Sequence, residues 1–217
     1  ADAQSLSTAY VLLPSVDCQL KTAHCALLTA IFYLVTMCFL SGSIISTLLA
    51  ALLLLKRPKS HAYLILTAWM RLITVHQVLA YLHYAGITQE YPHLLGVIMP
   101  WPLLHGPFLF LYVTAMTREK SLKWPEILPH FIPFVILYML AIPFFMLSAA
   151  EKTEVFNNKG AGYEWYNLTQ QAMIIIIGLG YIFWCLVRIH RHRTKIKQWF
   201  SNTDKITLRW LEYLSIG

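Results

Sequence analysis

The sequence predicts an all-α fold, a polytopic bundle of transmembrane helices. Three observations predict it: five long apolar stretches, a mainly hydrophobic composition, and basic residues that gather in alternate connecting loops. Of the 217 residues, 58% are hydrophobic and only 12% are charged, which is typical of a chain whose largest apolar burial is in lipid. The net charge of +7 therefore indicates topology, and by itself it is no evidence for DNA binding.

The five apolar stretches each have the roughly 20 residues that a helix needs to cross a bilayer. They cover approximately residues 30–55, 61–84, 94–117, 130–150 and 167–187. We expect an exterior lead-in over 1–29, a five-span membrane domain over 30–187, a basic cytoplasmic loop over 188–205 and the start of a sixth span over 206–217.

Turn residues mark the ends of these stretches. Pro58 follows the first stretch, Gly86 follows the second, and Pro125 and Pro129 precede the fourth.

Between the stretches, basic residues fall on alternate sides. Thirteen follow the first, third and fifth stretches: Lys56, Arg57, Lys59, Arg118, Lys120, Lys123, Arg188, Arg191, Arg193, Lys195, Lys197, Lys205 and Arg209. The opposite loops hold only Lys21, Lys152 and Lys159, so the N-terminus is predicted outside and the chain from Arg188 inside.

Cysteines and small residues suggest two further features. Cys18 and Cys25 lie in the exterior lead-in, where an oxidising compartment would allow a disulfide, and an unbridged pair is the equal alternative. No spacing of Cys and His indicates a metal site.

In the first stretch, small residues recur four apart, so that another helix can approach closely. These are Gly42, Ser43, Ser46 and Thr47. Packing inside the bundle is favoured over a homodimer.

Ionisable residues inside the spans are candidates for a ligand site, because a charge at mid-bilayer is costly. Arg71 lies in the second stretch with His76 after it, and His105 lies at a similar depth in the third. None of the five stretches contains Asp or Glu, so Arg71 pairs with polar groups of the bundle, with a carboxylate elsewhere, or with an anionic ligand. A structural role for Arg71 within the bundle is favoured over ligand binding.

Motifs of hydrolases, nucleotide-binding proteins and metalloenzymes are missing, so no enzyme and no cofactor is expected.

Three segments resemble the multi-span N-terminal domain of membrane-bound AraC-type transcriptional regulators. The first runs from Pro92 to Val113 and contains Trp101, His105, Gly106 and Pro107. The second, Trp124 to Phe134, contains His130, and the third runs from Arg188 to Leu211. The three segments occur in the order and spacing of that domain.

The resemblance implies a seven-span domain in the bacterial inner membrane that continues into a cytoplasmic helix-turn-helix domain, so DNA is contacted only through a domain beyond Gly217. It also makes Trp101, His105, Gly106, Pro107 and His130 candidates, with Arg71 and His76, for recognising a small or lipid-soluble signal. DNA regulators of this kind commonly act as dimers. The alternative is a small membrane accessory or assembly subunit that acts by helix packing alone.

Overall fold

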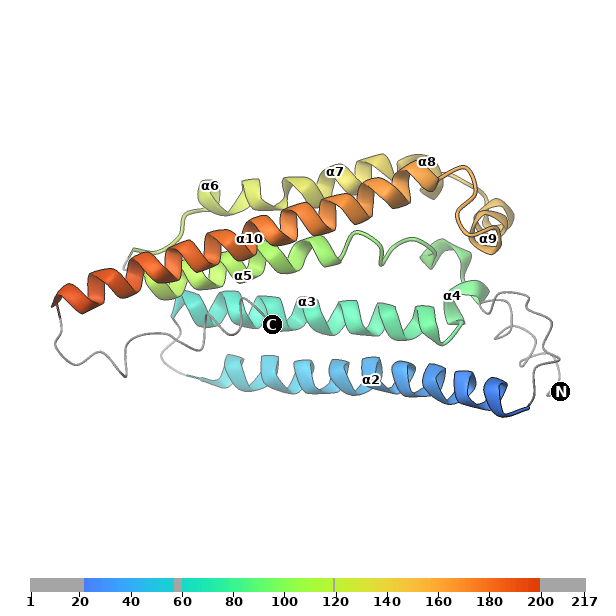
Figure 1. The fold of residues 1–217 in the computed structure, drawn as a ribbon, viewed down its shortest axis with the longest axis horizontal. Helices are drawn as coiled ribbons and strands as arrows, with labels where there is room; N and C mark the ends of the chain where they lie inside the picture. Colours follow the sequence, from blue (N-terminus) through green and yellow to red (C-terminus); the bar gives the residue numbers. More distant parts are fainter. Residues whose placement is uncertain (1–21, 57–59, 119, 200–217) are drawn as a thin grey trace. The chain divides into compact units, whose positions relative to one another are not determined.

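A computed structural model describes residues 22–56, 60–118 and 120–199, and every regular element in these ranges is helical (Figure 1). The elements are α2 (Thr22–Leu55), α3 (His61–Tyr84), α4 (Ile87–Glu90), η2 (Pro92–Leu94), α5 (Pro102–Thr117), α6 (Trp124–Ile127), η3 (Leu128–Phe131), α7 (Ile132–Leu140), α8 (Ile142–Phe145), α9 (Ala149–Asn157) and α10 (Glu164–Trp199). The predicted helical class is confirmed.

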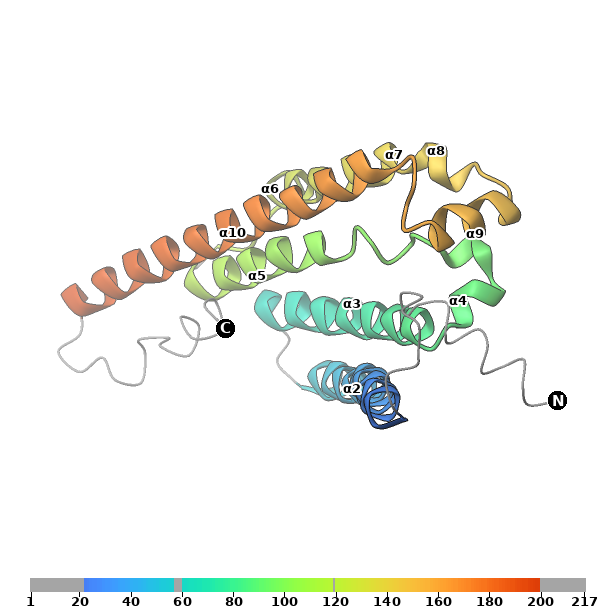
Figure 2. The same cartoon turned by 45° about the vertical axis from the view of Figure 1, so that its right-hand side comes forward.

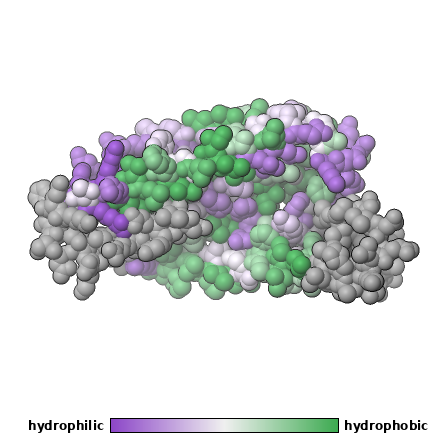
Figure 3. Space-filling model, in the orientation of Figure 1, coloured by the Kyte–Doolittle hydropathy of each residue, from purple (hydrophilic) through white to green (hydrophobic). Residues whose placement is uncertain are grey.

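Three of these helices are long and apolar enough to cross a membrane. The qualifying segments are Thr29–Leu55, His61–Tyr84 and Glu164–Lys195. In an 18-residue apolar part of each segment, at most 17% of the residues are buried. Large side chains such as Leu34, Leu48 and Leu52 are exposed. Apolar residues accordingly cover much of the surface in Figure 3. An outward-facing apolar surface of this kind suits lipid and not water.

The first two predicted stretches match single helices closely. α2 ends at Leu55 as expected, although it begins at Thr22, inside the predicted lead-in. α3 has the predicted bounds, and it stops where Gly86 takes a positive φ of 78°, a conformation that glycine adopts without steric cost. Cys18, and with it the predicted disulfide, lies outside the described residues.

The third and fourth predicted stretches are not single helices. Residues 95–101 form turns around Gly96, whose φ is 80°, and only Pro102–Thr117 is helical in the third stretch. The fourth is divided between η3, α7 and α8, and each of these short helices begins one residue before a proline. Pro129, Pro133 and Pro143 each stand in the first turn of one of these short helices, because proline lacks the N–H that a helix interior requires.

The expectation of a basic loop over 188–205 is corrected as far as the structure describes it. α10 continues without a break from Glu164 to Trp199, so the basic residues from Arg188 to Lys197 are helical. The stretch 181–199 contains neither Pro nor Gly and includes three Arg, two Lys and one Gln, which are good helix formers. The start of a sixth span, predicted over 206–217, lies outside the described residues.

The described chain forms two compact units. The first contains residues 22–49, 70–99 and 141–167. In it α2 and α3 lie side by side (Figures 1 and 2). Ser43 and Ser46 are buried there, the Ser46 hydroxyl lies 2.8 Å from that of Thr74, and a Cβ on Gly42 would lie 2.9 Å from Nε2 of Gln77. The small-residue face of α2 therefore packs on α3 of the same chain.

The second unit contains residues 50–56, 60–69, 100–118, 120–140 and 168–199 of the described chain. Its core joins α3, α5 and α10 through Ala62, Val113, Cys185 and Ile189, which are almost fully buried. Around them pack Ile65, Leu66, Trp69, Phe110, Ala115 and Met116. This core fixes α10 against α5 and so positions the site described next.

Candidate ligand-binding site

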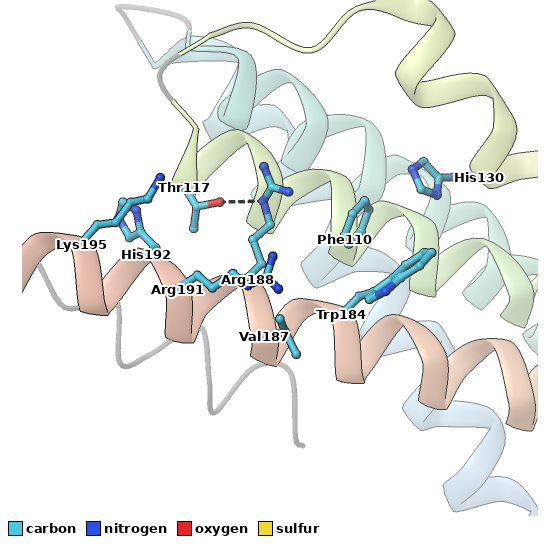
Figure 4. Close-up of a pocket in the computed structure, with 9 residues that line it drawn as sticks. All are labelled: Phe110, Thr117, His130, Trp184, Val187, Arg188, Arg191, His192 and Lys195. Atoms are coloured by element: carbon cyan, nitrogen blue, oxygen red, sulfur yellow. Dashed lines mark hydrogen bonds between the residues drawn. The ribbon is translucent and has the colours of Figure 1, made fainter.

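A cavity of about 490 Å³ lies in the second unit among α5, η3 and α10 (Figure 4). This volume is within the range of small-molecule sites. One part of its wall is aromatic and the other is basic. The lining residues are Phe110, Thr117, His130, Trp184, Val187, Arg188, Arg191, His192 and Lys195.

The aromatic part is built from three elements. The Phe110 ring of α5 lies 4.9 Å from the His130 ring of η3 and 5.7 Å from the Trp184 ring of α10, measured between ring centroids. Beside the cavity, Nδ1 of His130 lies 2.9 Å from the hydroxyl of Tyr181. These contacts link η3 to α5 and α10, because ring contacts and a hydrogen bond act at the same point.

The basic part comes almost entirely from one face of α10. Trp184, Arg188, Arg191 and Lys195 are spaced four, three and four residues apart, so they share a side of the helix. Figure 4 shows the Arg188 side chain extending toward α5. There its Nε donates a hydrogen bond of 3.0 Å to Oγ1 of Thr117. With Nε engaged, the terminal guanidinium nitrogens have no hydrogen bond to the described residues.

Negative charge is scarce around this basic wall. No acidic residue of the described chain lines the cavity. Glu126 is near enough to interact electrostatically with Arg188, but it is paired with Arg118 at 2.7 Å. Arg191 and Lys195 form no ion pair with the described residues, and both are exposed. The cavity therefore has an excess of positive charge.

Two predicted site residues support this arrangement from α5. A Cβ on Gly106 would lie 2.7 Å from Cδ2 of Tyr181, so the missing side chain permits the close contact of α5 with α10. Pro107 is fully buried beside it. Gly106 and His130, which come from different segments of the resemblance, thus meet the same ring of α10.

Two other predicted site residues lie in the second unit without lining the cavity. The indole nitrogen of Trp101 donates to the hydroxyl of Tyr138 at 3.1 Å. Nδ1 of His105 accepts from the indole nitrogen of Trp69 at 3.2 Å. Both side chains therefore make contacts within the bundle. Such a packing role was the alternative to ligand binding for these residues.

Arg71 and His76 belong to the first unit. The Arg71 side chain is exposed and makes no hydrogen bond or ion pair with the described residues, whereas His76 is half-buried. The first unit also has an apolar cavity of about 150 Å³ beside Gly96, Phe144 and Tyr163. Neither Arg71 nor His76 lines that cavity or the basic one. The structure thus gives these two residues no part in either site.

Sequence reasoning included His130 but missed the other residues that line the larger cavity. Their signal was present, since the basic residues after the fifth stretch repeat at helical spacing with Trp184. It was interpreted as anchoring at the cytoplasmic face by positive charge and as attraction to anionic lipid, because the segment was taken for a loop. Within the described ranges, no cluster of three or more His, Cys, Asp or Glu side chains could hold a metal ion.

Comparison of the chain with models of protein families, with curated proteins and with solved structures finds no match.

Proposed function

We propose that this chain is the sensory membrane domain of a one-component transcriptional regulator of the AraC type, located in the bacterial inner membrane. The observation that carries the proposal is the convergence of Gly106 and His130 on Tyr181 of α10. Two segments chosen for their resemblance to that family meet at one ring, next to the basic cavity. A bundle with no role beyond packing has no need of an open basic cavity at this point.

In this proposal α10 carries the signal. It contributes Trp184 and Arg188 to the cavity and runs on as one helix to Trp199. A ligand held between α5, η3 and α10 would favour one position of α10 over another, because it binds the two positions with different affinity. The helix passes that preference to a cytoplasmic helix-turn-helix domain beyond Gly217. That domain contacts promoter DNA, while the basic face of α10 binds the ligand.

The proposed topology has five spans with the N-terminus outside. Besides the three long helices, α5 and the apolar segment Trp124–Leu140 would cross. α5 has 16 residues and so a length of about 24 Å, somewhat less than a hydrocarbon core of about 30 Å. The preceding turns at 95–101 would supply the remaining depth. Such non-helical backbone is tolerated in a membrane where protein covers it.

The alternative of an accessory subunit that acts by packing gains no support from the first unit. The small-residue face of α2 that would recruit a partner is occupied by α3, through the Ser46–Thr74 contact and the Gln77 side chain over Gly42.

The test is made on the native protein in its own membrane. We expect C-terminal peptide sequencing to find a helix-turn-helix segment after Gly217, and chromatin immunoprecipitation to recover promoter fragments with the membrane-bound protein. The Tyr181→Ala variant should retain its membrane level but lose regulated transcription of the genes at those promoters, while the exposed control Tyr33→Ala should not. A native chain that has no such segment and occupies no promoter would contradict the proposal and favour the accessory role.

A further inference from the structure

We infer that the cavity of the second unit binds an anionic amphiphile, a molecule with a phosphate or carboxylate head and an apolar tail. The inference deepens the proposed function, and it rests on that function in taking the bound molecule as the signal. Both membrane lipids and free acyl compounds have this chemistry. The argument depends on how the basic and aromatic residues divide the cavity between them.

The head group is specified by the basic face of α10. Arg188, Arg191 and Lys195 bring three positive charges to one cavity, and no acidic residue of the described chain lines it. Arginine recognises phosphate and carboxylate through two parallel N–H donors. The bond from Nε to Thr117 orients the Arg188 guanidinium, which leaves its terminal nitrogens to face such a ligand.

The tail is specified by the other part of the wall. Phe110 and Trp184 lie with their ring centroids 5.7 Å apart, and Val187 adds an apolar side chain between Trp184 and Arg188. An inorganic anion would leave this surface uncovered, whereas an acyl chain or an apolar ring would bury it favourably. Because one helix face carries apolar side chains at Trp184 and Val187 and basic side chains from Arg188 to Lys195, the ligand should carry both properties.

General attraction of anionic lipid to basic residues is the competing explanation. It predicts that any exposed basic residue on the predicted cytoplasmic side contributes to the binding of an anionic lipid as much as a basic residue of the cavity does. Lys120 and Lys123 supply a matched comparison. Both are exposed, both follow the third apolar stretch, and neither lines the cavity. Removing either pair of charges lowers the net charge by the same amount.

The experiment uses the native full-length protein in neutral detergent micelles, with bound molecules counted by native mass spectrometry. The probes are phosphatidylglycerol, phosphatidylcholine, sodium dodecanoate and inorganic phosphate. We expect one molecule of phosphatidylglycerol or dodecanoate per chain. Binding of the first alone would identify a lipid source, and binding of the second alone a free amphiphile. The variant Arg188→Gln/Arg191→Gln should bind at least tenfold more weakly, and Lys120→Gln/Lys123→Gln should bind as the unaltered protein does.

Two further variants separate recognition from misfolding. Arg188→Lys/Arg191→Lys keeps both charges and should recover part of the affinity, since lysine cannot offer the planar pair of donors. Trp184→Ala should weaken dodecanoate binding. Equal binding of phosphatidylcholine, an equal loss in the Lys120/Lys123 variant, or inorganic phosphate that binds as tightly as dodecanoate would each overturn the inference. The sensory proposal is tested separately by promoter occupancy, so the two can fail independently.

Discussion

Nδ1 of His130 and the hydroxyl of Tyr181 lie 2.9 Å apart, although the two residues are 51 positions apart in the sequence. The bond ties the short helix η3 to α10 beside the basic cavity. The same hydroxyl lies 3.4 Å from the backbone oxygen of His130. The pair should hold η3 and α10 in one register.

The first prediction removes that hydroxyl. Tyr181→Phe should lower the free energy of unfolding by about 0.6 kcal/mol and by no more than about 1.7 kcal/mol, the average and the maximum for a hydrogen bond between membrane helices, because the ring packing stays. Unfolding in mixed micelles, followed by circular dichroism, measures the change. Tyr33→Phe is the control, since Tyr33 is 59% exposed and should show no loss. Equal changes in the two variants would mean that the bond with His130 adds no stability.

The second prediction concerns the contact of α5 with α10. Gly106→Ala places a Cβ 2.7 Å from Cδ2 of Tyr181, so either the ring or the helix must shift. Overpacking of this kind costs about 1–3 kcal/mol, more than the gain of up to about 1 kcal/mol from the helix propensity of alanine. Thermal unfolding in detergent should show a lower midpoint.

Gly178→Ala provides the matched control for Gly106→Ala. Gly178 is also helical, and a Cβ there would meet no atom within 4 Å. This variant should be as stable as the unaltered chain or slightly more so. A midpoint for Gly106→Ala that equals that of Gly178→Ala would show that the two helices are not in close contact at Gly106.

Helix ends were predictable from the sequence where a single local signal decides them. α3 has its predicted bounds because Pro58 stands shortly before it and Gly86 takes a left-handed conformation just after it. The breaks in the fourth stretch were missed because its mean hydropathy conceals Pro133 and Pro143. Their missing N–H groups divide an apolar run that is otherwise long enough to span.

The cavity could not be predicted from the sequence because it depends on which helices pair. Arg188 and Thr117 are 71 residues apart, and no local pattern relates them. His130 was selected through its sequence segment, and its partner Tyr181 carries no signal of its own. The helical spacing of Trp184 with the basic residues was readable, but it indicated a shared face only once the basic segment proved to be helical.

The third prediction decides how many segments cross the membrane. Single cysteines replace four exposed residues, Lys56, Glu90, Lys120 and Glu154, in a chain without its native cysteines. With five spans and the N-terminus outside, a membrane-impermeant maleimide should label Glu90→Cys and Glu154→Cys in intact cells. It should label Lys56→Cys and Lys120→Cys only after permeabilisation. If only α2, α3 and α10 crossed, Lys120→Cys would react in intact cells, and the five-span topology would be wrong.

The last prediction concerns pH and the start of α9, which lies in a predicted exterior loop. Hydrogen bonds from the side chain and backbone of Ser148 hold the pKa of Glu151 below its usual value of 4.5. The Ser148 amide donates to Oε2 of Glu151 at 2.8 Å, and the Glu151 amide donates to Oγ of Ser148 at 3.4 Å. This capping box satisfies donors that the first turn would otherwise leave unpaired.

Because the folded-state pKa is lowered, the carboxylate stabilises the first turn of α9 at pH values above 4.5, and the effect disappears as the pH falls through that lowered pKa. NMR titration of the Glu151 side chain in micelles should give this lowered value, and the protection factors of the α9 amides against hydrogen exchange should fall at pH values below it. Ser148→Ala should raise the pKa of Glu151 toward 4.5. Thr153→Ala, which removes a hydroxyl from the same helix outside the cap, should leave it unchanged. A Glu151 pKa that is the same with and without the Ser148 hydroxyl would show that the cap does not form.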